Sequence, residues 1–124
     1  MDFKFDTTKN YTIILPEFHT LNEDMAEKLR TELTNLQQKG VVNFIIDLNN
    51  IKNSEASGRS LLLELHAQVY NNEGSLVFTE LQDNVLQLMK KDQLHLSLNI
   101  APTSIEAKDI INMEVLERDL LNEL

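Results

Sequence analysis

The feature that most constrains the fold is an apolar run from Val41 to Leu48, which is rich in β-branched and aromatic residues and carries no charge before Asp47. Such a run is typical of a strand that is buried on both faces of a sheet. The polar segment 49–57 follows and leads to a second helix that we expect to begin near Ser57. Unpaired backbone N–H groups and the positive end of the helix dipole favour an anion at that point.

Strand-like and helical segments alternate along the rest of the chain. Gly40 and Gly74 stand where the first and second helices end, so we expect the same kind of C-terminal cap at both. Thr103 and Glu106 form a capping-box pattern at the start of the last helix. The expected strands are residues 3–7, 11–15, 41–48 and 75–79 and one within 94–100, and the expected helices are 22–39, 57–73, 84–91 and 103–124.

This alternation predicts crossover connections, and therefore parallel pairing of the later strands under a cover of helices. The first two strands are expected to form a hairpin. A chain of 124 residues is long enough for one domain and too short for two, so we expect a single domain over residues 1–124. The residues expected in its core are Phe44, Ile46, Leu62, Leu65, Val77 and Leu88.

The net charge excludes some classes of partner. With 20 acidic and 11 basic residues, the formal charge is −9, and no basic cluster offsets it. Such a surface repels nucleic-acid phosphates and anionic membranes. Because the chain has no cysteine, no signal-peptide pattern and no apolar run of about 20 residues, we expect a cytoplasmic protein without membrane insertion.

The sequence around the second helix start resembles the STAS domain of bacterial anti-sigma factor antagonists. The shared order is an apolar strand, Asp47, a polar turn, an acidic residue, two small residues, glycine and an apolar helix. In that family the turn reads Asp-Ser-Ser-Gly, and its first serine is phosphorylated by the anti-sigma kinase that the domain binds. Those four positions fall on Glu55, Ala56, Ser57 and Gly58, so alanine occupies the phosphoacceptor position.

The neighbouring positions differ from the family as well. Asn53 and Ser54 stand where relatives usually carry apolar residues, and Arg59 stands where they usually carry leucine. We expect Arg59 to face solvent or to pair with a carboxylate such as Glu55. Ser57 is interpreted as the N-cap of the helix, with a displaced phosphoacceptor as the alternative.

The resemblance implies the STAS fold, a mixed and mostly parallel sheet of about five strands with about four helices. It also implies a non-enzymatic interaction module that binds an anti-sigma factor or kinase-like regulator. The implied docking surface is the turn from Glu55 to Arg59 together with the loop after Pro16, which carries Phe18. A homodimer is compatible with the sequence.

No catalytic, cofactor or metal-binding motif emerges from the residues. Glycine-rich phosphate loops are excluded because the chain has only three glycines. His19, His66 and His95 lack metal-ligand spacing, and His66 is interpreted as a structural histidine at the margin of an apolar helix face. We therefore predict no enzyme, no cofactor and no metal.

Two other functions remain open. The chain is alternatively an accessory STAS module of a transport or lipid pathway or a small-ligand-binding domain, which an apolar pocket at the sheet edge would favour. The second alternative is a small enzyme, which a histidine within hydrogen-bond reach of Glu55 would favour. The last helix is interpreted as core, and its surplus Leu120, Leu121 and Leu124 provide a partner-helix contact as the alternative.

Overall fold

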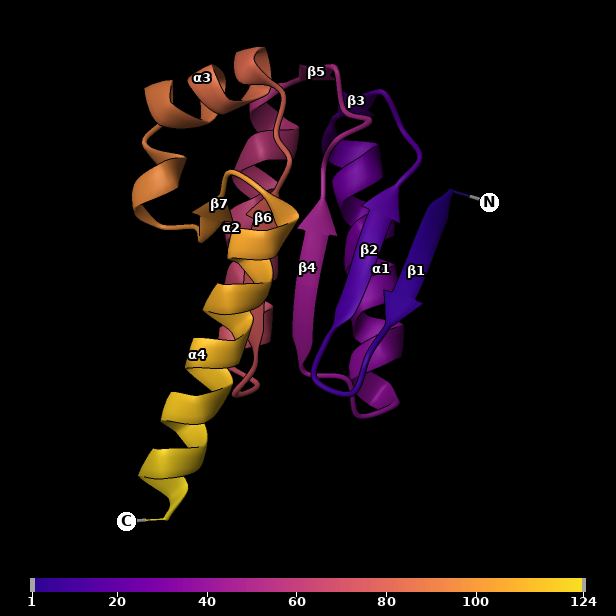
Figure 1. Cartoon of the computed structure of the whole chain (residues 1–124). Helices are drawn as coiled ribbons and strands as arrows, with labels where there is room; N and C mark the ends of the chain where they lie inside the picture. Colours follow the sequence, from indigo (N-terminus) through magenta and orange to yellow (C-terminus); the bar gives the residue numbers. More distant parts are fainter. Residues whose placement is uncertain (1, 124) are drawn as a thin grey trace.

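The computed structural model describes residues 2–123, which form a mixed sheet with helices on both faces (Figure 1). The elements, in chain order, are β1 (Phe3–Thr7), β2 (Thr12–Pro16), β3 (Thr20–Leu21), α1 (Glu23–Gln38), β4 (Asn43–Asp47), β5 (Asn53–Ser54), α2 (Ala56–Tyr70), β6 (Ser75–Thr79), α3 (Asp83–Lys91), the 3-10 turn η1 (Leu94–Leu96), β7 (Ile100–Ala101) and α4 (Ser104–Asn122).

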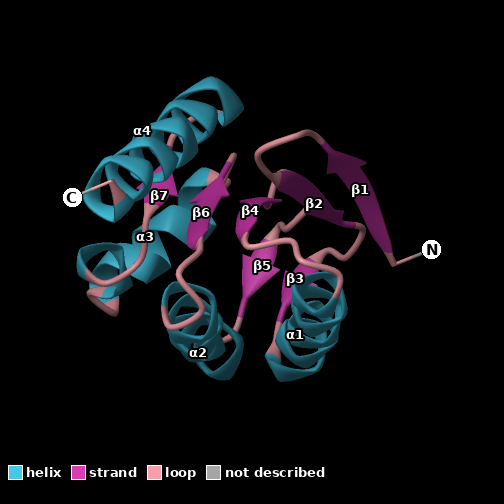
Figure 2. Ribbon diagram, turned by 90° about the horizontal axis from the view of Figure 1, so that it is seen from below, coloured by secondary structure: helices cyan, strands magenta, loops and turns pink. Residues whose placement is uncertain are grey.

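The main sheet has five strands in the order β1-β2-β4-β6-β7. β1 and β2 are antiparallel, and every other neighbouring pair is parallel. Helices α1 and α2 cover one face of this sheet, while α4 lies on the other (Figure 2). The predicted mixed and mostly parallel sheet with four helices is therefore confirmed. The two-stranded parallel sheet of β3 and β5 was not predicted.

The central strand β4 is buried on both faces, as its apolar composition predicts. Phe44 and Ile46 belong to the larger core under α1, α2 and α3, whereas Ile45 belongs to a smaller core under α4. Of the six residues predicted to be buried, five are fully buried. Leu88 is half-buried instead. Val85 and Met89, which are four residues apart, form the face of α3 that points to the core, and Leu88 lies at the side of that face.

Two other boundaries differ from the predictions. The segment 94–100 contains the 3-10 turn η1 and only the start of the two-residue strand β7. The first helix is capped by Asn22, whose side chain accepts the Met25 N–H at 2.9 Å. The expected cap of the last helix is confirmed, since the Thr103 hydroxyl accepts the Glu106 N–H at 3.3 Å.

None of the helices in residues 2–123 is both long and apolar enough to cross a membrane.

Helix α1 ends in a Schellman motif. The Val41 N–H donates to the Leu36 carbonyl and the Gly40 N–H donates to the Gln37 carbonyl, both at 3.0 Å. Gly40 has the positive φ of 93° that this motif requires. The predicted role of Gly40 is confirmed.

Helix α2 ends in the same pattern of bonds, but its glycine has another role. The Gly74 N–H donates to the Val69 carbonyl at 3.0 Å and the Glu73 N–H donates to the Tyr70 carbonyl at 3.2 Å. The left-handed residue is therefore Glu73, with φ of 58°. Gly74 is needed for close packing instead, because a Cβ there would lie 1.8 Å from the Val42 carbonyl oxygen. The prediction of one role for both glycines is wrong in this respect.

This difference predicts unequal costs for the two alanine substitutions. Gly74→Ala lowers the free energy of unfolding by about 3 kcal/mol, because the methyl group must displace backbone. Gly40→Ala is the matched control: its methyl group meets open space, so only left-handed strain of about 1 kcal/mol applies. Urea denaturation of both variants measures the two costs. A smaller loss for Gly74→Ala than for Gly40→Ala would contradict the packing role.

Candidate docking site

The turn before α2 is tied to the loop after Pro16 by backbone hydrogen bonds. The Lys52 and Asn53 N–H groups donate to the His19 carbonyl at 2.7 and 3.1 Å, and the Glu55 N–H donates to the Leu21 carbonyl at 2.9 Å. These bonds surround the parallel pair β3–β5, which lies beyond the carboxyl end of β4 (Figure 1). The two segments expected to form the docking surface therefore lie side by side.

Gly58 allows the first turn of α2 to rest on the backbone in front of α1. A Cβ at this position would lie 2.6 Å from both the Asn22 Cα and the Leu21 carbonyl oxygen, and 2.7 Å from the Asn22 carbonyl carbon. Real Cβ atoms essentially never approach backbone atoms this closely. A side chain at Gly58 would therefore separate the start of α2 from the β3 segment and the start of α1.

Arg59 pairs with a carboxylate, which was one of its two predicted positions, but the partner is Asp92 rather than Glu55 and the side chain is buried. The Arg59 side chain is 7% exposed, and its Nε donates to Asp92 Oδ2 at 2.8 Å. Nη1 donates to the Ser54 carbonyl at 3.0 Å and to the Ser54 hydroxyl at 2.8 Å. The side chain turns inward because these acceptors satisfy its charge and its donors together, which an exposed Glu55 on the outer side does not. Arg59 thus fastens β5 to the end of α3.

Helix α2 begins earlier than predicted, so Ser57 is not its N-cap. The N-cap is Glu55, which has extended backbone dihedrals and makes no capping bond through its side chain. Its N–H is held by the Leu21 carbonyl, which fixes the extended conformation just ahead of Ala56. Ser57 lies inside the first turn, where its carbonyl accepts the Ser60 hydroxyl at 3.0 Å. Glu55, Ala56 and Ser57 are all exposed.

Phe18 lies in the neighbouring loop, but its ring is half-buried and packs against β1 and α1. Its centroid is 5.5 Å from that of Phe3 on β1, and the Lys28 ammonium lies 5.5 Å above the ring. These contacts hold the loop against β1 and α1. The expected direct contact between Phe18 and a partner stays a prediction.

Asp47, at the end of β4, belongs to the motif order of the sequence analysis, which gave its side chain no role of its own. Burial raises the pKa of its carboxyl, and the nearby Glu80 carboxylate raises it further, while a hydrogen bond from the Asn49 N–H lowers it. That N–H donates to Oδ1 at 2.9 Å. Asp47 therefore orders the turn that leaves the sheet, and the run of Asp and Asn after an apolar strand was the available signal.

The family-model scan matches the STAS domain over residues 5–107, most of the chain. The protein belongs to the STAS domain family. Among solved structures, TM1081 of Thermotoga maritima, provisionally classed as an anti-sigma factor antagonist, aligns with a TM-score of 0.77 and 14% identity over 89% of this chain and 94% of its own. The unphosphorylated anti-sigma factor antagonist SpoIIAA aligns with a TM-score of 0.70 and 19% identity over 89% and 96% of the two chains.

SpoIIAA of Bacillus has also been solved in its phosphorylated form, which aligns with a TM-score of 0.62 and 19% identity over 88% of this chain and 98% of its own. At these identities the likeness to solved structures concerns the fold alone. None of the curated proteins matched this chain in a sequence search.

The histidine contact to Glu55 that would favour the small-enzyme alternative is not found within residues 2–123. Among the hydrogen bonds within residues 2–123, none joins Glu55 to a histidine, and no cluster of three or more metal-ligating side chains is found there. His66 packs its ring against Tyr70, with 4.3 Å between the ring centroids, and burial lowers its pKa. This contact agrees with its predicted structural role, but its buried Nδ1 has no hydrogen-bond partner within residues 2–123, contrary to the expectation of a satisfied side chain.

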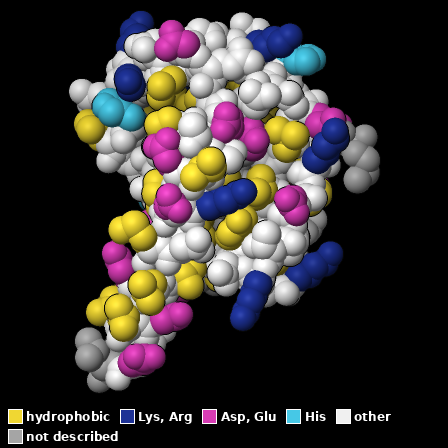
Figure 3. Space-filling model, in the orientation of Figure 1, with side chains coloured by type: hydrophobic (Ala, Val, Ile, Leu, Met, Phe, Trp, Pro, Cys, Tyr) yellow, Lys and Arg dark blue, Asp and Glu magenta, His cyan; other side chains and the backbone are white. Residues whose placement is uncertain are grey.

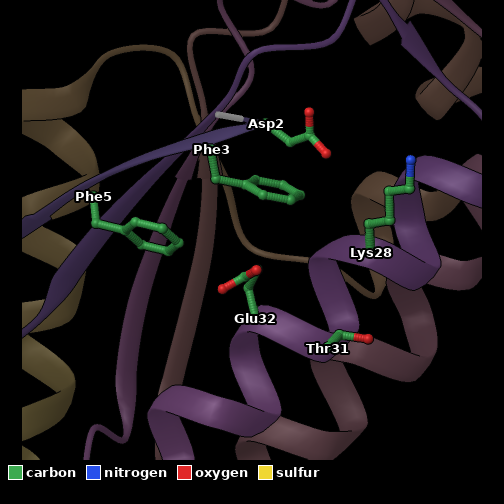
Figure 4. A pocket seen from close by; sticks show the side chains of 6 residues that line it. All are labelled: Asp2, Phe3, Phe5, Lys28, Thr31 and Glu32. Atoms are coloured by element: carbon green, nitrogen blue, oxygen red, sulfur yellow. The ribbon is translucent and has the colours of Figure 1, made fainter.

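The ligand-binding alternative rests on hollows at the sheet edge. One of about 290 Å³ lies between β1 and α1, where the rings of Phe3 and Phe5 project from the strand (Figure 4). Asp2, Lys28, Thr31 and Glu32 supply the rest of its lining. Four of these six residues are charged or polar, and the two rings supply its apolar wall. A second hollow, of about 320 Å³ beside the edge strand β7, is lined mainly by apolar residues, among them Leu81, Leu86 and Ile100. An apolar hollow at the sheet edge is therefore present, and the ligand-binding alternative stays open.

The Arg59–Asp92 pair predicts an asymmetry between its two truncations. Asp92→Ala leaves the charged Arg59 side chain, which is only 7% exposed, without its carboxylate, so the free energy of unfolding should fall by about 3 kcal/mol. Arg59→Leu should cost only about 1 to 2 kcal/mol, because the Asp92 side chain is already 33% exposed and can be solvated.

Denaturation of both variants tests this, with Asp109→Ala as a control in which an exposed acidic residue is removed. The control should stay within about 0.5 kcal/mol of the parent. A decrease in the free energy of unfolding for Arg59→Leu that equals or exceeds the decrease for Asp92→Ala would contradict the argument that Arg59 is the more deeply buried partner.

Proposed function

We propose that this STAS domain is a non-enzymatic interaction module of a bacterial signalling pathway, which binds an anti-sigma factor or a kinase-like regulator. The docking surface is the turn from Glu55 to Arg59 with the adjoining loop after Pro16. The observation that carries this proposal is the exposure of Glu55, Ala56 and Ser57 on a turn that is fixed from behind. Gly58 packs the turn against the backbone of Leu21 and Asn22, and Arg59 bonds it to Asp92. The surface is therefore already formed before a partner binds.

The chemistry of this surface suits a protein partner better than a reaction. Its exposed side chains are one carboxylate, one methyl group and one hydroxyl, at a helix start where unpaired N–H groups face outward. No general base is paired with the hydroxyl among the hydrogen bonds of the described chain. The module acts by binding in the cytoplasm, without a cofactor or metal.

Ala56 determines how such binding is regulated. It occupies the first position of α2, which is exposed, and its methyl group accepts no phosphate. The relative SpoIIAA exists in phosphorylated and unphosphorylated forms. In the present domain the usual switch is missing, so binding is either constitutive or controlled elsewhere. Ser57 is the neighbouring hydroxyl, and its exposure makes it the alternative acceptor.

Restoring the acceptor should restore phosphorylation. We expect no transfer from an anti-sigma kinase of the same host to the natural chain, and measurable transfer to Ala56→Ser. The added charge is favoured at the helix N-terminus by roughly 0.3 to 1 kcal/mol. Mass spectrometry after incubation with ATP and the kinase locates the phosphate. Ala56→Ser combined with Ser57→Ala is the matched control, and it should be phosphorylated equally.

The alternative outcomes contradict different parts of the proposal. Phosphate on Ser57 of the natural chain would show that the domain is switchable and that the acceptor is displaced rather than lost. Phosphate on neither Ala56→Ser nor the double variant would show that an anti-sigma kinase does not dock here in the usual geometry.

A further inference from the structure

The last helix is fixed to the domain along one face. Ala107 and Ile111 are fully buried against the sheet. Further along, the Tyr70 hydroxyl donates to Glu114 Oε1 at 2.8 Å, and Arg118 donates to Asn43 Oδ1 and to the Ser75 hydroxyl, both at 2.9 Å. The helix is therefore held in place as far as Arg118, and its final turns project past the sheet (Figure 1).

The opposite face of α4 carries an apolar stripe. Met113, Leu116 and Leu120 are 62%, 59% and 54% exposed, and their spacing of three and four residues places them on one side of the helix. Figure 3 shows apolar side chains along the projecting part of the molecule, with acidic side chains between them. Leu121, also expected to be available for a partner, is exposed but lies on another side of the helix; Leu124 lies outside the described residues.

Carboxylates border this stripe. Asp109, Glu117, Asp119 and Glu123 are exposed, and each stands three or four residues from a member of the stripe. None of them forms an ion pair within residues 2–123. Of the two basic residues in α4, Arg118 is turned inward and Lys108 is half-buried. The border of the stripe is therefore negatively charged, and no basic side chain of α4 neutralises it.

This charge pattern decides which partner fits. A second copy would bring the same carboxylates face to face, in a chain whose formal charge is already −9. A helix with its own apolar stripe and flanking Lys or Arg residues would bury the leucines and pair with the carboxylates.

We propose that the face of α4 formed by Met113, Leu116 and Leu120 is a docking surface for a basic amphipathic helix of another protein. It lies at the end of the domain away from the turn before α2 (Figure 1), so the two surfaces can be occupied together. It also lies beyond residue 107, where the STAS match ends. The proposal does not depend on what binds the turn.

The test uses a synthetic helical peptide of about 18 residues, made of lysines with leucines along one face, and the full chain. Calorimetry should detect binding to the natural protein and a loss of about tenfold or more for Leu116→Asp. Leu96→Asp is the matched control, because Leu96 is 73% exposed and the change in charge is the same. It should bind within about twofold of the natural protein. Leu116→Ser replaces Leu116→Asp if the latter does not fold.

A peptide of the same composition with scattered leucines should not bind, because it cannot present an apolar face. Equal binding of the two peptides, equal losses for both variants, or no binding of the amphipathic peptide would overturn the proposal. So would a dimer of the natural protein, detected by sedimentation, that Leu116→Asp dissociates, since the occupant would then be a second copy.

Discussion

Close packing between Gly58 and the backbone of Leu21 and Asn22 is the contact on which the docking end of this STAS domain depends. Because α2 can approach to this distance, β5 pairs with β3 and the turn before α2 is joined to the loop before α1. Arg59, the next residue, adds a charged bond to Asp92 that ties the same turn to α3. The exposed residues of the turn are therefore presented by a rigid frame.

The fold was largely predictable because its signals are local. The apolar run of β4, the Schellman glycine at position 40 and the cap at Thr103 each act over a few residues. The predicted partner of Arg59 and the predicted role of Gly74 were wrong because the residues that determine their positions are distant in the sequence. Arg59 is buried by Asp92, 33 residues away, and Gly74 is required by the Val42 carbonyl. Spacing in a single sequence does not reveal such partners, and it placed Ser57 rather than Glu55 at the helix cap.

Helix α4 packs on the sheet with one face and exposes an apolar stripe on the other. Its inner face combines apolar packing with polar bonds, of which the one from Tyr70 to Glu114 is half-buried. Burial is the main cause that raises the pKa of Tyr70 to about 12, with the bond to Glu114 contributing. Since the folded pKa then exceeds the unfolded value near 10, this part of the stability is lost as pH rises from about 10 to 12. Below about pH 10 the Tyr70 hydroxyl keeps its bond to Glu114, and α4 then holds the exposed Met113, Leu116 and Leu120 in a fixed position.

Hydrogen exchange with and without the anti-sigma factor of the host tests most directly whether the turn is the docking surface. The first amides of α2 have no acceptor within the helix, so they exchange readily until something covers them. Protection on binding is expected across residues 19–22 and 53–59, with residues 113–120 unchanged. Unchanged exchange at 53–59, with protection confined to the hollow beside β1 or to α4, would contradict the account.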